Sequence, residues 1–126
     1  MLYDTEQSEV QLFKNVGNLL ARAKQPDKPD ELKAFCLTGM SRKERLNAIV
    51  QSMDKFYYQY GGIQLVVIDG IADLVKSAND EAESVAVIDE LYRLAGIYNT
   101  LAVIWMPSVS PSAPAGQMQP ATIAAT

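Results

Sequence analysis

An aspartate at the end of an apolar run is the residue of this chain best placed to do chemistry. The run from Leu65 to Ile68 is apolar throughout and leads into Asp69, a pattern typical of a parallel strand covered on both faces. Open α/β sheets bind ligands at the carboxyl ends of such strands, and an aspartate there can hold Mg²⁺ beside nucleotide phosphates. The structural alternative is a turn, because Asp69 precedes Gly70 and Asp-Gly is a common turn pair.

A second carboxylate follows a predicted strand near the start of the chain. Residues 2–6 have the pattern of a strand that delivers Glu6 to the loop before a helix. A glutamate in this place could orient and deprotonate an attacking water, which phosphoryl transfer to water requires. The alternative is a helix-start charge, which the helix dipole stabilises. If both strands belong to one parallel sheet, Glu6 and Asp69 end at the same edge.

The hydrophobic spacing predicts the elements that must position these two residues. Helices are predicted from Ser8 to Lys24, from Ser41 to about Tyr58, and from Asp80 to about Ala95, with capping boxes at Ser8/Gln11 and Ser41/Glu44. Strands are predicted at residues 2–6, 34–37, 63–68 and 101–106. This alternation predicts an α/β fold with a mainly parallel sheet of at least four strands and helices on both faces.

Composition narrows the class of protein. With 126 residues and 48% hydrophobic side chains the chain fits one domain, and its net charge of -4 argues against a strongly basic nucleic-acid surface. The sequence has no histidine and one cysteine, Cys36, so a histidine-based triad and a Cys/His metal site are excluded. We interpret Cys36 as a buried core thiol and expect a cytoplasmic protein without a membrane segment.

The end of the sequence differs from the rest. No charged side chain follows Arg93, and residues 107–126 are rich in Pro, Ser and Ala. One interpretation is a flexible tail after a domain at residues 1–106. The other is that the original reading frame is lost near Trp105, so that residues 107–126 are translated out of frame.

Three stretches together resemble a known family. They are Leu2 to Ser8, the helix start Ser41 to Leu46, and Val66 to Glu81. They resemble RecA-like P-loop ATPases related to replicative helicases, the RepA- and DnaB-type group often carried on mobile elements, over roughly residues 1–106. The resemblance implies a three-layer RecA-like core, ATP and Mg²⁺ as cofactors, and DNA as a partner. It assigns the Walker B aspartate at magnesium to Asp69 and the catalytic glutamate to Glu6.

The chain also departs from this family. No Gly-x-x-x-x-Gly-Lys-[Ser/Thr] phosphate loop occurs in it, and the family's phosphate loop and central strand are expected to lie before residue 1. Met106 stands where the family has a polar sensor of the γ-phosphate. We therefore expect a truncated or degenerate helicase-related ATPase that is inactive alone.

The missing strand has a consequence for partners. We expect it to expose apolar edges beside the strand that ends at Asp69, covered by self-association, an intact relative or the tail. The alternative function is a non-catalytic oligomerisation or regulatory module on the same scaffold. A third interpretation is a gene remnant without selected activity.

The remaining residues of interest have structural interpretations. Asp73 and Asp80 fall in the loop after the predicted Walker B strand, where their role is open. The basic residues of the second helix are interpreted as a solvated face, and the tyrosines near its end as a cover for the sheet edge rather than a base-stacking platform. These are Arg42, Lys43, Arg45, Tyr57, Tyr58 and Tyr60. Trp105 is interpreted as a core residue.

Overall fold

Strands and helices alternate in the computed structural model, which describes residues 1–75, 81–107 and 118–124. The elements are β1 (Leu2–Asp4), α1 (Glu9–Arg22), β2 (Ala34–Cys36), α2 (Arg42–Tyr60), β3 (Leu65–Asp69), the 3-10 helix η1 (Ile71–Leu74), α3 (Glu81–Tyr98), β4 (Leu101–Pro107) and β5 (Met118–Ala124). They form one sheet of order β2-β1-β3-β4-β5, in which the first four strands are parallel and β5 is antiparallel to β4. The predicted α/β fold with at least four parallel strands is confirmed.

The α1 and α2 helices begin at serines that cap them, and α2 ends at a glycine. Ser41 and Glu44 form the complete predicted capping box of α2, whereas Ser8 caps α1 through Gln11 N alone. The α2 helix ends at Gly61, whose φ of 76° is the left-handed conformation that glycine adopts without strain.

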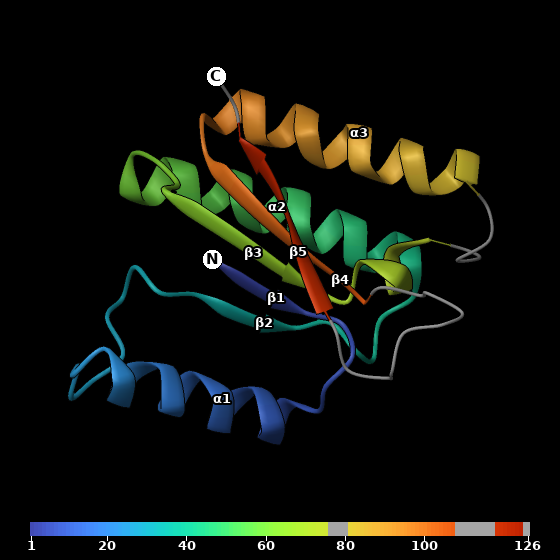
Figure 1. The fold of residues 1–126 in the computed structure, drawn as a ribbon. Helices are drawn as coiled ribbons and strands as arrows, with labels where there is room; N and C mark the ends of the chain where they lie inside the picture. Colours follow the sequence, from blue (N-terminus) through green and yellow to red (C-terminus); the bar gives the residue numbers. More distant parts are fainter. Residues whose placement is uncertain (76–80, 108–117, 125–126) are drawn as a thin grey trace.

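Helices lie on both sides of the sheet. Figure 1 shows α1 on one side and α2 and α3 on the other. The main core joins β1, β3 and β4 to α2 and α3, with Tyr3, Ile49, Ile68, Leu94 and Ile104 among its members. Leu12 and Val16 are the buried residues of α1 on the opposite side. Within the described part of the chain, no helix is both long and apolar enough to cross a membrane.

The central strand β3 is paired on both sides, with β1 at one edge and β4 at the other. The expectation of an exposed apolar edge beside this strand is therefore wrong. The outer edge of β4 is covered by β5, which lies within the predicted tail. Residues 118–124 therefore differ from the prediction of a flexible tail, because their backbone supplies the partner that the β4 edge requires. Pro120 is compatible with this place, since an edge strand tolerates a residue that lacks an N–H.

The loop predicted after Gly70 contains an element that the sequence did not reveal. Ile71 to Leu74 form η1, and both of its end residues are buried. They anchor the chain directly after β3 to the core, so the end of this strand is held in place. Asp80, by contrast, lies outside the described residues.

Replacing Ile68 by Ala tests the contribution of β3 to the core. Ile68 is 1% exposed, so the variant should lose about 2–5 kcal/mol of unfolding free energy through the lost transfer energy and the cavity. Urea denaturation measures this loss. The matched control is Leu65→Ala in the same strand, because Leu65 is 43% exposed and its loss should stay below about 1 kcal/mol. Equal losses for the two variants would contradict the packing described here.

Candidate functional site

The ends of β1 and β3 bring the two predicted carboxylates to one edge of the sheet. The strands are parallel, and Asp4 is the register partner of Asp69. Glu6 lies two residues beyond Asp4, in the loop before α1. Its pKa responds to the charge of Asp69, so the two carboxylates are electrostatic neighbours.

A close approach between Thr5 and Gly70 locks these strand ends together. Thr5 is almost fully buried, and its hydroxyl donates to the carbonyl oxygen of Gly70 at 2.7 Å. The same hydroxyl lies 3.1 Å from Asp73 Oδ2. A Cβ added to Gly70 would collide with Thr5 Oγ1 and would lie 2.6 Å from Glu6 Cγ. Two constraints therefore require glycine at position 70. There is no space for a Cβ, and the φ of 89° lies in the left-handed region that glycine adopts without strain.

Asp4 shapes the loop that carries Glu6. Its side chain is 2% exposed, and its Oδ1 accepts hydrogen bonds from Glu6 N at 3.0 Å and Gln7 N at 2.9 Å. This Asx-type turn fixes the direction in which the chain leaves β1. It also occupies two backbone N–H groups that could otherwise face an anion.

Burial and neighbouring carboxylates raise the pKa of both candidate residues. Desolvation is the larger cause of the raised pKa of Asp69, followed by the charge of Asp4. Desolvation is also the largest cause of the raised pKa of Glu6, and the charges of Asp69, Asp73 and Asp4 raise it further. Negative charge is thus concentrated at this edge. A cation bound there would relieve the repulsion.

Arg45 reaches the same region from α2 but does not pair with these carboxylates in the contacts observed. Its guanidinium donates to the carbonyl oxygens of Leu37, Thr38 and Asp73 at 3.0, 3.0 and 2.8 Å. It thereby ties the loops after β2 and β3 to α2. The prediction of a solvated helix face is therefore wrong for Arg45. Arg42, on the same helix, forms an ion pair with Glu83 of α3.

The acidic edge does not by itself form a metal site. Within the described ranges, no group of three or more Asp, Glu, Cys or His residues has the geometry to hold a metal ion. Asp69 and Glu6 could supply carboxylate oxygens to Mg²⁺, which commonly binds one or two carboxylates and completes its octahedron with water or phosphate oxygens. The carboxylates fit the ion chemically, and its other ligands would have to come from elsewhere.

The structure leaves the other predicted residues outside this site or undescribed. Cys36 is half-buried rather than fully buried, and its Sγ contacts Gln7 O at 3.5 Å. Met106 lies in β4, and the side chains of Trp105 and Met106 lie outside the described part of the chain.

Asp4 and Thr5 were not predicted as members of the site. Asp4 carried a usable signal, since an aspartate two and three residues before the bonded N–H groups is typical of an Asx turn. Thr5 carried none, because its contacts to Gly70 and Asp73 span more than sixty positions of sequence.

Comparisons with family models, curated proteins and solved structures gave no match to this chain. The resemblance to RecA-like ATPases therefore depends on the residues themselves.

Two glycine substitutions with opposite expected effects on stability test the close approach of Thr5 and Gly70. Gly70→Ala should destabilise the protein by about 1–3 kcal/mol or more, because of its positive φ and its contact with Thr5. Gly17→Ala is the matched control, since Gly17 lies in α1 with open space around its Cβ position. It should stabilise the protein by about 0.5–1 kcal/mol. Thermal unfolding of both variants measures the difference, and a neutral Gly70→Ala would contradict the contact.

The raised pKa values predict a pH-dependent effect of removing the charges. A carboxyl with a higher pKa in the folded state binds more protons there, so its contribution to stability falls as pH rises from the unfolded value through the folded one. Asp69→Asn and Glu6→Gln should therefore raise the melting temperature at pH 7. The gain should disappear once the pH falls below the ordinary pKa values of Asp and Glu, 3.8 and 4.5.

The control for this experiment is Glu90→Gln. The pKa of Glu90 is lowered by its hydrogen bonds from Arg93, so neutralising it should not raise the melting temperature at pH 7. Melting curves from pH 3 to 8 compare the three variants. A loss of stability in Asp69→Asn at pH 7 would contradict the repulsion inferred here.

Proposed function

We propose that this chain is a partial RecA-like ATPase related to replicative helicases, whose retained part is the magnesium edge of the catalytic site. The observation that supports this most is that Asp69 ends β3 while Glu6 follows the adjacent parallel strand β1, with Glu6 Cγ close to Gly70. Helices on both sides of the sheet are compatible with the three-layer arrangement of that family.

In the proposed site each carboxylate has a separate role. Asp69 would hold Mg²⁺ through water, and Glu6 would accept a proton from the attacking water. The raised pKa of Glu6 brings this group closer to neutral pH, which favours a general base. When bound, Mg²⁺ supplies positive charge that stabilises the phosphates and the transferring group. Thr5 and Asp4 hold the two strand ends in register.

Tight nucleotide binding requires groups beyond those described. Backbone N–H groups are the usual cradle for phosphates, but those of Glu6 and Gln7 are bonded to Asp4. The first turns of α1 and α2 are capped by Ser8 and Ser41. The residues described would therefore bind the metal more readily than the nucleotide. We propose that hydrolysis requires a phosphate loop supplied from outside these residues.

The second candidate is a non-catalytic module that joins an oligomer or an intact relative. The edge of β2 that faces away from β1 favours this second candidate, since β2 pairs within the described sheet only with β1. Exposed apolar residues of α1, Val10 and Phe13, provide further contact area. DNA would be contacted through such an assembly rather than through an acidic chain alone.

Mn²⁺ as a paramagnetic substitute for Mg²⁺ tests the metal edge by NMR. Bound Mn²⁺ should broaden the amide signals of Glu6 and Gly70 first, because both lie beside Asp69. Asp69→Asn should remove this selective broadening. Asp89→Asn is the control, since Asp89 is an exposed carboxylate of α3. Equal broadening in both variants would overturn the assignment of Asp69.

Calorimetry with ATP and Mg²⁺ tests the nucleotide half of the proposal. The isolated chain should bind ATP more weakly than a Kd of about 1 mM, which corresponds to about -4 kcal/mol. Binding in the micromolar range that Asp69→Asn abolishes would show a complete nucleotide site and contradict the partial one. Absence of both metal and nucleotide binding would favour the non-catalytic module.

A further inference from the structure

A cavity lies at the opposite edge of the sheet from the carboxylates. It has a volume of about 660 Å³ and is formed where α2 and α3 end and β3 begins. Gly61 and Gly62 form the rim after α2, and Leu65 forms the wall at the start of β3. Because the carboxylates lie at the other end of β3, this cavity is independent of the function proposed above.

Aromatic rings form much of the cavity wall. Tyr57 of α2 and Tyr98 of α3 are both lining residues, with ring centroids 5.4 Å apart and planes inclined by 49°. The two rings therefore form a corner rather than a stack. Phe56 and Tyr60 also line the cavity and pack against each other at 4.5 Å. The faces of aromatic rings attract cations, above all poorly hydrated organic ones.

The charges around the cavity also favour a cation. Glu31 is the charged side chain among the described lining residues, and the lining includes neither Lys nor Arg. The α2 and α3 helices both end here without a basic residue in their last turns. The C-terminal ends of both helices thus bring the negative ends of two helix dipoles to this end of the sheet.

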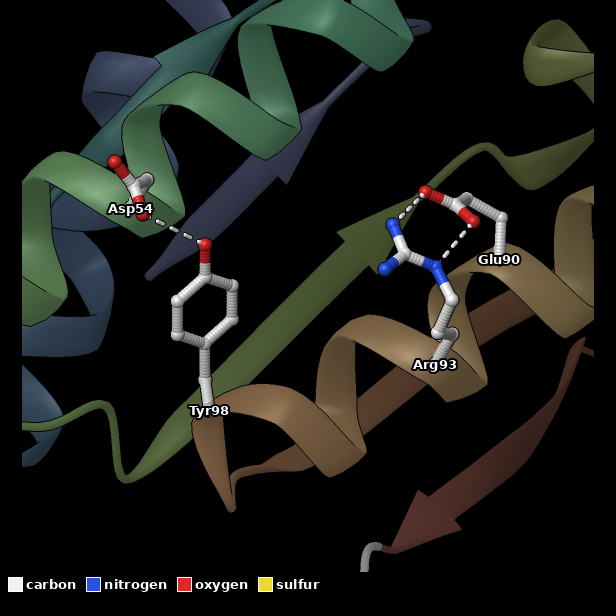
Figure 2. Close-up of polar contacts among 4 residues, drawn as sticks. All are labelled: Asp54, Glu90, Arg93 and Tyr98. Carbon is white, nitrogen blue, oxygen red and sulfur yellow. Dashed lines mark hydrogen bonds and ion pairs between the residues drawn. The ribbon is translucent and has the colours of Figure 1, made fainter.

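Asp54 adds negative charge behind one ring. Figure 2 shows Tyr98 pointing from α3 to Asp54 of α2, where the Tyr98 hydroxyl donates to Asp54 Oδ1 at 3.1 Å. This bond fixes the orientation of the ring and increases its electron density. Arg93 of α3 is engaged by Glu90 through two hydrogen bonds, so its charge is largely neutralised close to its own helix.

Two cations of the chain lie nearby, and neither covers the Tyr57–Tyr98 corner in the contacts observed. Lys33 Nζ lies 5.7 Å from the ring centroid of Tyr60, which demonstrates a cation–π contact at a neighbouring ring. Met1 itself lines the cavity, and its amine donates to Leu65 O at 2.6 Å. Burial lowers the pKa of this amine.

We propose that this cavity binds a small organic cation, with an alkylated ammonium head placed against the rings of Tyr57 and Tyr98. The volume accommodates a ligand with an apolar body, since small-molecule sites range from about 300 to 1,000 Å³. An inorganic ion is disfavoured because aromatic rings do not replace the oxygen ligands of Mg²⁺ or Ca²⁺.

Choline and its uncharged analogue 3,3-dimethylbutan-1-ol separate charge recognition from shape. NMR titration of the full chain to about 50 mM detects dissociation constants in the millimolar range. Choline should give saturable shifts at Gly61, Gly62 and Asn99, which line the cavity. The analogue has the same shape without the charge, so it should bind about tenfold more weakly.

Two neighbouring tyrosines provide matched variants. Tyr57→Leu keeps an apolar wall but removes a ring, and should weaken choline binding several-fold. Tyr57 is 36% exposed, which makes the substitution compatible with folding. Tyr58→Leu is the control, because Tyr58 is 80% exposed and does not belong to the lining residues. Glu31→Gln at the rim should reduce affinity about twofold without a change in the core.

The proposal fails in three cases. Equal affinity for choline and its uncharged analogue would show an apolar pocket without cation recognition. Unchanged choline affinity in Tyr57→Leu would place binding elsewhere. Absence of saturable shifts would show that the cavity does not take this class of ligand. None of these outcomes bears on the Mn²⁺ experiment, which concerns the other end of β3.

Discussion

The contact between Thr5 and Gly70 is the constraint on which the acidic edge depends. Only glycine leaves room for the Thr5 hydroxyl at this place, and the hydroxyl in turn bonds the Gly70 carbonyl. Asp69 is therefore held at the end of β3 while Glu6 leaves β1 beside it. A larger residue at position 70 would separate the strand ends. The electrostatic coupling of the two carboxylates would weaken with it.

This arrangement concentrates like charges at a cost in stability. Asp69 and Glu6 both have raised pKa values, first from desolvation and then from neighbouring carboxylates. A purely structural turn needs one aspartate, which Asp4 already provides through its bonds to the following N–H groups. Among the hydrogen bonds of the described residues, none holds the carboxylate of Asp69 or Glu6 in a comparable way. Groups whose pKa values are perturbed in this way cluster at functional sites, which favours a cation-binding role over a structural one.

Local patterns predicted most of the fold, and long-range contacts account for what they missed. The Ser41/Glu44 capping box and the apolar run before Asp69 placed α2 and β3 close to their observed bounds. The strand β5 could not be predicted in this way, because its existence depends on the edge of β4 rather than on its own pattern. The role of Arg45 could not be predicted for the same reason, because it depends on long-range contacts. Its carbonyl partners come from two loops, while its spacing along α2 resembles that of any exposed basic residue.

The cation sites proposed at the two ends of β3 use different side-chain chemistry, and this separates the kind of cation that each would bind. At the carboxyl end the oxygens of Asp69 and Glu6 suit a hard divalent ion that keeps part of its water shell. At the amino end Tyr57 and Tyr98 offer ring faces, which compensate poorly for the dehydration of such an ion but well for that of an alkylammonium. The same strand would therefore join two proposed sites with little overlap in ligand class. Their separation follows from side-chain chemistry and does not require the net negative charge of the chain.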